Sequence, residues 1–135
     1  MLAYYNAGTL QFYDNSSVDL STISQNTPGL YFNAGPWLVK SGKINPDIVK
    51  SRSHWQSKTY RTAMLRKNDG SVYFLVATAK IDLPQFIVFA YMSKIVATGE
   101  KFDLVNLDGG SSTSIWSPGL TFNSKKRLPL FIGIK

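Results

Sequence analysis

The sequence of 135 residues contains no cysteine. Disulfide frameworks, thiolate zinc sites and cysteine nucleophiles are therefore excluded. There is a single histidine, His54, and a single glutamate, Glu100. A Ser–His–Asp triad would have to include His54, and a two-histidine metal site and a pair of catalytic glutamates are both impossible. Any chemistry must rest on aspartate, Asn, Ser, Thr, Tyr, Arg and Lys side chains and on backbone amides.

Long apolar runs are also missing. The longest apolar segment is Phe86–Met92, far short of the roughly 18 uninterrupted apolar residues of a membrane-spanning helix. The first residues, Met1–Tyr5, show neither the basic region nor the apolar region of a signal peptide. We therefore expect no membrane span, and these features leave the compartment open.

Positive charge is in excess, with 15 Lys and Arg residues against 8 Asp and Glu residues and a net charge of +7. The excess lies in residues 28–67, which contain eight basic residues and one acidic residue, Asp47. This distribution indicates either an anionic partner or a solvated basic face. A nucleic-acid partner is not expected, because no basic run extends beyond Lys125–Arg127 and no nucleic-acid-binding motif is present.

The apolar pattern predicts an α+β domain with a mainly antiparallel sheet and one principal helix. The expected strands cover residues 10–13, 29–33, 37–39, 61–66, 72–77, 102–107, 112–116 and 128–134. Asp69 and Gly70 predict a hairpin whose two turn positions both tolerate positive φ. Residues 45–58 are polar and basic and are expected to form a long surface loop.

The helix is predicted over residues 83–97, about 15 residues with one buried face. Asp82 is the expected N-cap, and Pro84 lies in the first turn, where its missing N–H costs nothing. Gly99 is expected to end the helix. The face expected to be buried is formed by Phe86, Phe89, Ala90, Ser93, Val96 and Ala97.

Three short segments carry residue types suited to ligand binding. Residues 106–113, Asn-Leu-Asp-Gly-Gly-Ser-Ser-Thr, place a carboxylate beside backbone amides that two glycines expose. Residues 33–36, Asn-Ala-Gly-Pro, interrupt an apolar strand and suit a bend that presents Asn33. Arg61 begins a strand and could bind a phosphate through two hydrogen bonds. Each segment also has a plain structural interpretation: a hairpin turn, an edge-strand break and a surface arginine.

Taken together, these segments resemble the motifs of the phosphodiester glycosidase family, whose bacterial members are often linked to exopolysaccharide biosynthesis. Residues 33–43, Asn-Ala-Gly-Pro-Trp-Leu-Val-Lys-Ser-Gly-Lys, are similar to the family's A-G-P-x-L-V-x-x-G-K segment. Residues 61–63 and the hairpin that follows resemble its R-[ST]-A…D-G strand pair. Residues 106–112 resemble its N-L-D-G-G-x-S turn. Order and spacing agree from Asn26 to the C-terminus.

The resemblance implies hydrolysis of a sugar-1-phosphodiester on a polysaccharide or envelope glycan. Asp108 would act as acid/base or stabilise a cationic sugar centre, and Arg61 would bind the phosphodiester and offset charge on the leaving phosphate. The implied substrate-binding residues are Asn33, Gly35, Thr62, Asn106, Gly109, Gly110, Ser111 and Ser112. Because phosphate leaves readily as an anion, such a site needs charge stabilisation more than it needs a general acid.

No cofactor and no metal are expected, because no cluster of ligating side chains is visible, although Asp108 could attract a hard cation. The expected partner is a sugar phosphodiester or another anionic glycan, and the oligomeric state is left open. The resemblance favours a periplasmic or extracellular location. It also implies a single domain over residues 1–135 that lacks the upstream portion of other members. The alternative function is a non-catalytic module that binds anionic glycans or sugar phosphates through the same fold.

Overall fold

The computed structural model describes residues 2–6, 9–13, 30–49 and 53–123. All strand pairs in this part of the chain are antiparallel. They form a five-stranded, a three-stranded and a two-stranded sheet. The predicted class, α+β with a mainly antiparallel sheet and one principal helix, is confirmed.

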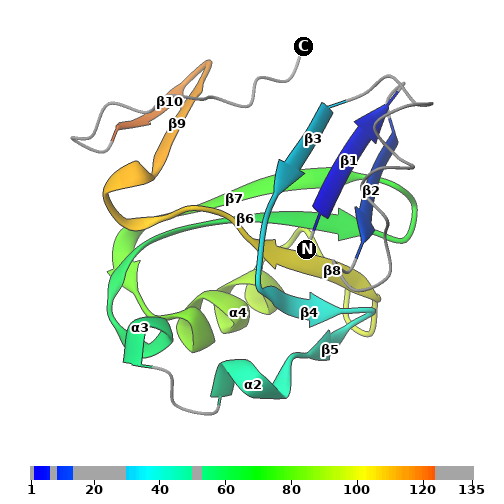
Figure 1. Cartoon of the computed structure of the whole chain (residues 1–135), viewed down its shortest axis with the longest axis horizontal. Coiled ribbons are helices and arrows are strands. Elements are labelled where there is room, and N and C mark those ends of the chain that lie inside the picture. The colour runs from blue at the N-terminus through cyan, green and yellow to red at the C-terminus, as the bar shows by residue number, and fades with distance from the viewer. Residues whose placement is uncertain (1, 7–8, 14–29, 50–52, 124–135) are drawn as a thin grey trace.

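The five-stranded sheet forms the centre of the molecule and has the order β5-β4-β8-β6-β7 (Figure 1). Its members are β4 (Trp37–Lys40), β5 (Lys43–Ile44), β6 (Thr59–Lys67), β7 (Val72–Ile81) and β8 (Phe102–Asn106). Strand β8 comes late in the chain but lies between β4 and β6. The residues that precede β4, begin β6 and follow β8 therefore meet at one end of the sheet.

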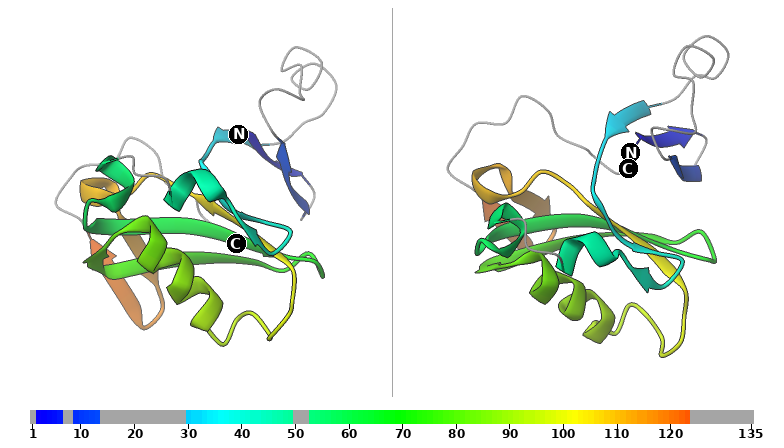
Figure 2. Two further views of the ribbon diagram at one scale, coloured as in Figure 1. Left: turned by 90° about the horizontal axis from the view of Figure 1, so that it is seen from below. Right: turned by 60° about the horizontal axis from the view of Figure 1, so that its bottom comes forward.

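The principal helix, α4 (Leu83–Met92), covers one face of this sheet (Figure 2). Asp82 is its N-cap, as predicted, because its carboxylate accepts a hydrogen bond from the Gln85 N–H at 2.7 Å. One buried cluster contains the α4 residues Leu83, Phe86, Ile87 and Ala90 together with Leu38, Ala63, Leu65, Leu75 and Leu104 from the sheet. Within the described residues, no helix has the length and apolar character needed to cross a membrane.

The helix is shorter than the predicted range of 83–97. It ends at Met92, because Ser93 has an extended backbone (φ −66°, ψ 144°) and its hydroxyl donates to the Ala90 carbonyl at 2.7 Å. Ile95 and Val96 still pack against the core, but from turns. Apolar spacing alone therefore could not distinguish two more helical turns from a chain that folds back onto the core.

Two details of the predicted helix are also wrong. Phe89 is 55% exposed, because the buried face of the helix is formed by Leu83, Phe86, Ile87 and Ala90 and does not include it. Gly99 has a positive φ of 79°, but it lies in a later turn, where the Glu100 N–H donates to the Ala97 carbonyl at 3.0 Å. Gly99 thus permits a turn without ending the helix.

The predicted hairpin between β6 and β7 is confirmed. Its turn differs from the expected one, because Gly70 has a positive φ (87°) and Asp69 does not. The Gly70 N–H donates to the Lys67 carbonyl at 3.1 Å, and the Lys67 N–H donates to the Ser71 carbonyl at 2.9 Å. This is the pattern of a three-residue loop closed by one left-handed glycine.

Residues 45–58 do not form the predicted surface loop. They contain two short helices, α2 (Pro46–Val49) and α3 (Ser53–Gln56). Ile48 and Trp55 from these helices are buried in the core cluster. Helices of four residues are too short to show an apolar periodicity, so the polar composition of the segment concealed them. His54 lies in α3, and its side chain is outside the described residues.

The remaining strands form two smaller sheets. Strands β1 (Leu2–Asn6), β2 (Thr9–Tyr13) and β3 (Leu30–Asn33) lie over the face of the central sheet opposite α4 (Figures 1 and 2). Strands β9 (Ser114–Ser117) and β10 (Leu120–Asn123) pair with each other. The strand predicted over 112–116 starts late, because Gly110–Ser112 form a 3-10 helix, η1. The strand predicted over 128–134 lies outside the described residues.

Candidate active site

A cavity of about 560 Å³ lies where the three sequence segments meet. Its lining comes from the β3–β4 connection, the start of β6, and the turn after β8. The lining residues are Ala34, Gly35, Thr59, Arg61, Asn106, Leu107, Asp108, Gly109 and Gly110. Residues from three distant parts of the chain therefore share one concave surface.

The β3–β4 connection is held against the end of β8 by three hydrogen bonds. The Gly35 N–H donates to the Asn106 carbonyl at 2.8 Å, and the Asn106 N–H donates to the Pro36 carbonyl at 3.0 Å. The Asn106 side-chain amide donates to the Gly35 carbonyl at 3.3 Å. The Gly35–Pro36 peptide is cis, and Gly35 has a φ of 136° that suits only glycine. The interruption predicted at this point thus forms one wall of the cavity.

Arg61 is a buried side chain, only 8% exposed, and not the surface arginine that was the alternative interpretation. Its Nε donates to the Ile81 carbonyl at 3.2 Å, and its Nη2 donates to the Ser57 and Trp55 carbonyls at 2.6 and 3.4 Å. Burial lowers the pKa of Arg61, and the nearby charge of Asp82 opposes that effect. An arginine stays protonated in proteins, so a positive charge is fixed in the cavity wall.

Asp108 lies on the turn after β8 and is exposed. Its carboxylate accepts a hydrogen bond from the Gly109 N–H at 2.9 Å. Its carbonyl accepts one from the Thr62 hydroxyl, and the Leu107 N–H donates to the Thr62 carbonyl at 2.9 Å. Thr62 therefore ties the turn to β6, next to Arg61, while the Asp108 side chain stays at the cavity.

Packing requires glycine at position 109, whereas at position 110 a tight contact and a positive φ both favour it. A Cβ atom on Gly109 would stand 2.8 Å from the Tyr60 carbonyl oxygen, and one on Gly110 would stand 3.2 Å from the Thr59 hydroxyl. Gly110 also has a positive φ of 61°. The plain hairpin interpretation is wrong, because β9 pairs with β10 and not with β8. The two glycines allow the turn after β8 to pack closely against the backbone of β6.

The sequence model of the phosphodiester glycosidase family matches residues 2–133. The chain belongs to the phosphodiester glycosidase family. Comparison with curated proteins and with solved structures gives no significant match. Because the match spans all three segments, the family predicted from the motifs is confirmed, and the cavity is the candidate active site.

Most of the predicted site residues line this one cavity: Gly35, Arg61, Asn106, Asp108, Gly109 and Gly110. Thr62 lies behind the lining, and neither Ser111 nor Ser112 is part of it. Asn33 ends β3 just before the lining residue Ala34, and its side chain is outside the described residues.

Sequence reasoning missed three lining residues of the cavity: Ala34, Thr59 and Leu107. Two of them are direct neighbours of predicted residues. Thr59 is two positions before Arg61 in β6, and the period of two in a strand places such residues on one side. That periodicity is the signal that could have found it.

One buried polar atom of a lining residue has no hydrogen-bond partner among the described residues. The Asn106 side-chain oxygen is buried and accepts no hydrogen bond from any described residue. Buried polar atoms are almost always bonded, so this oxygen is an exception within the described part of the chain. In the described part of the chain, no three His, Cys, Asp or Glu side chains are grouped as metal ligands would be.

Proposed function

We propose that this phosphodiester glycosidase hydrolyses a sugar-1-phosphodiester carried by a polysaccharide or envelope glycan. The supporting observation is that the buried Arg61 guanidinium and the Asp108 carboxylate line the same cavity. The substrate requires both charges. Its phosphate is negative, and its sugar C1 becomes positive as the C1–O bond breaks.

Arg61 is assigned to the phosphate. Its hydrogen bonds to three carbonyl oxygens hold the guanidinium in place without neutralising its charge. A positive charge that is already oriented and partly shielded from water stabilises developing negative charge strongly. The leaving phosphate takes the electron pair of the C1–O bond, and the guanidinium offsets the extra charge.

Asp108 is assigned to the sugar carbon. Its carboxylate either stabilises the positive charge at C1 or removes a proton from the attacking water. The water oxygen forms the new bond to C1, and the proton passes to the carboxylate and then to solvent. The products are a free sugar and a phosphate monoester.

The other lining residues are assigned to substrate binding. Asn106 is assigned to this role as a lining residue, and the backbone of Gly109 and Gly110 lies beside Asp108. Gly35 forms the facing wall, with Asn33 just before it. Thr62 acts indirectly, by holding the Asp108 carbonyl.

The test is turnover of a panel of sugar-1-phosphate aryl esters by the protein and by Asp108→Asn. The variant should lose roughly 10²–10³-fold in turnover, as when one charge-stabilising group is removed from an active site. Its unfolding midpoint should not change, because Asp108 is exposed. Asp47→Asn is the matched control, since Asp47 is exposed and lies outside the cavity lining. Equal turnover by Asp108→Asn and the unaltered protein would refute the assignment.

A non-catalytic module that binds anionic glycans is the second candidate. It is favoured by one observation: Asp108 is the only carboxylate among the described residues that lines the cavity, whereas most glycosidases use two. This function requires that the unaltered protein binds a sugar phosphodiester and releases no product. Calorimetric binding and product analysis on the same sample distinguish the two functions.

A further inference from the structure

A second hollow, of about 490 Å³, lies at the other end of strands β4 and β8. The active-site cavity adjoins the start of β4 and the end of β8, whereas this hollow adjoins the end of β4 and the start of β8. Its wall is ordered by two hydrogen bonds. The Tyr91 hydroxyl donates to the Gly42 carbonyl at 2.8 Å, and the Gly42 N–H donates to the Phe102 carbonyl at 2.9 Å.

Positive charge gathers at this hollow. Lys43 and Lys101 line it, and both are exposed. Lys101 lies against the β4–β5 turn, because a Cβ atom on Gly42 would stand 3.5 Å from the Lys101 Cα. Lys43 is directly opposite Lys40 in the β4–β5 pair. The Lys40 ammonium lies over the Trp37 ring, 5.3 Å from its centroid, whereas Lys43 faces the hollow.

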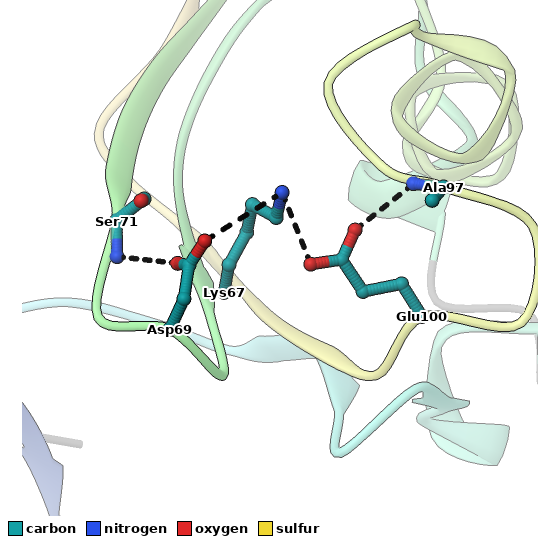
Figure 3. Close-up of polar contacts among 5 residues, drawn as sticks. All are labelled: Lys67, Asp69, Ser71, Ala97 and Glu100. Carbon is teal, nitrogen blue, oxygen red and sulfur yellow. Dashed lines mark hydrogen bonds and ion pairs between the residues drawn. The ribbon is translucent and has the colours of Figure 1, made fainter.

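The carboxylates at this end of the sheet are already bound to other groups. Glu100 lies 3.0 Å from the Lys67 ammonium and accepts a hydrogen bond from the Ala97 N–H at 2.9 Å (Figure 3). Asp69 faces the same ammonium at 3.9 Å. Figure 3 shows Lys67 between these two carboxylates, on the far side of Glu100 from the Ala97 N–H.

The next carboxylate along β8, Asp103, is also occupied. It pairs with Arg66 at 2.6 Å and accepts a hydrogen bond from the Ser41 N–H at 2.8 Å. Lys43 and Lys101 consequently have no ion pair with any described residue. Glu100 also lines the hollow, but it is paired with Lys67, so neither lining lysine has an ion pair with a described carboxylate.

We propose that this hollow is a second binding site, which takes a phosphate or carboxylate group of a glycan chain. Ammonium groups form strong charge-assisted hydrogen bonds to such anions. Tyr91, which is 37% exposed, adds an apolar ring face beside them, suited to the apolar face of a sugar. A concave site with a ring, lysines and nearby hydroxyls fits a glycan better than a flat lipid surface. The choice of glycan as the carrier rests on the proposed function, and the anion site itself does not.

The experiment measures binding by calorimetry at low salt, in the Asp108→Asn background so that turnover of the probe is slow during the titration. The probe is an oligosaccharide with phosphodiester links, and its neutral counterpart has glycosidic links between the same sugars. Lys43→Gln/Lys101→Gln should raise the Kd for the charged probe at least about tenfold, the effect of losing one charge-assisted hydrogen bond. Lys94→Gln is the matched control, because Lys94 is exposed nearby and does not line the hollow. It should change the Kd by less than about twofold, as expected for an exposed charge outside the site that salt and water screen.

Three results would overturn this site. The first is equal weakening by Lys94→Gln and by the double variant, which would mean a non-specific charge effect. The second is equal affinity for the charged and neutral probes. The third is binding to vesicles of phosphatidylglycerol that depends on Lys43 and Lys101, with no binding of the oligosaccharide. The turnover assay of the first proposal is separate, so failure of catalysis and failure of this site can be distinguished.

Discussion

Gly109 and the Tyr60 carbonyl are in such close contact that a Cβ atom on Gly109 would stand 2.8 Å from that oxygen. Tyr60 immediately precedes Arg61, and Gly109 immediately follows Asp108. The distance between the two proposed catalytic side chains is therefore set by backbone packing between β6 and the turn after β8. A side chain at position 109 would force these two segments apart.

Gly109→Ala should consequently reduce both stability and turnover. The added methyl group meets backbone atoms, which cannot rotate away, so a loss of about 1–3 kcal/mol in the free energy of unfolding is expected. Urea denaturation measures it. Gly99→Ala is a useful comparison, because that site has open space and only its positive φ to oppose alanine. It should cost about 1 kcal/mol and leave turnover intact. A stable and fully active Gly109→Ala would refute the packing argument.

Two buried threonines should respond in opposite ways to replacement by valine. Thr62→Val removes the hydroxyl bonded to the Asp108 carbonyl and should cost about 1 kcal/mol. It should also lower kcat, since the turn that carries Asp108 loses a support. Thr113→Val should be neutral or stabilising, because the Thr113 hydroxyl is buried with no partner among the described residues. Thermal melts compare them, and a similar loss in both variants would contradict the assigned roles.

Arg61→Lys should destabilise the protein although it keeps the charge. A lysine cannot reproduce the bonds from one guanidinium to the Trp55, Ser57 and Ile81 carbonyls. A loss on the order of 2–3 kcal/mol is expected, together with weaker turnover. Arg66→Lys is the control, because its ion pair with Asp103 is partly exposed and should be worth less than about 1 kcal/mol. Equal melting temperatures for the two variants would count against the structural role of Arg61.

Stability should fall in acid because of the ion-pair cluster formed by Lys67, Asp69 and Glu100. Hydrogen bonds from the Ala97 N–H and from Lys67 lower the pKa of Glu100 below its ordinary value of 4.5. The bond from Ser71 lowers the pKa of Asp69 below its ordinary value of 3.8. A lowered carboxyl pKa stabilises the fold above the ordinary value and loses that effect as the pH falls through the folded value. Melting temperatures between pH 2.5 and 6 should therefore decrease below about pH 4.5.

The same cluster predicts that the stability of the fold also decreases at high pH. The bond to Glu100 raises the pKa of Lys67 above 10.5, so its contribution is complete below 10.5 and is lost as the pH rises through the folded value. Glu100→Gln should flatten both limbs of the melting profile, because it removes the carboxylate and the partner of Lys67. Unchanged limbs in this variant would show that other groups control the pH dependence.

Local features of the fold were predictable because they depend on neighbours in the chain. The Asp82 cap, the glycine turn at Gly70 and the strands around it follow from the conformational preferences of a few adjacent residues. Where those preferences were ambiguous, the prediction failed. Ile95 and Val96 have helical spacing but reach the core from turns, and Trp55 is buried from a helix too short to show a period.

The three motifs of the candidate site could be predicted from the sequence, but their arrangement in space could not. The sequence by itself determined which chemical groups are present: one carboxylate beside two glycines, one arginine at the start of a strand, and one Gly-Pro interruption. It also determined the family, because the order and spacing of these motifs can be recognised in the sequence before the fold is known.

Only the tertiary structure decided that these groups share a cavity. Strand β8 lies between β4 and β6, which brings Gly35 into hydrogen-bond contact with Asn106, 71 positions away, and places the Asp108 turn against β6. The tertiary structure also buries Arg61, and it leaves Lys43 and Lys101 without carboxylate partners in the described residues. The physical reason is that strand pairing and burial depend on which apolar faces pack together across the whole chain, whereas sequence spacing constrains only the residues nearby.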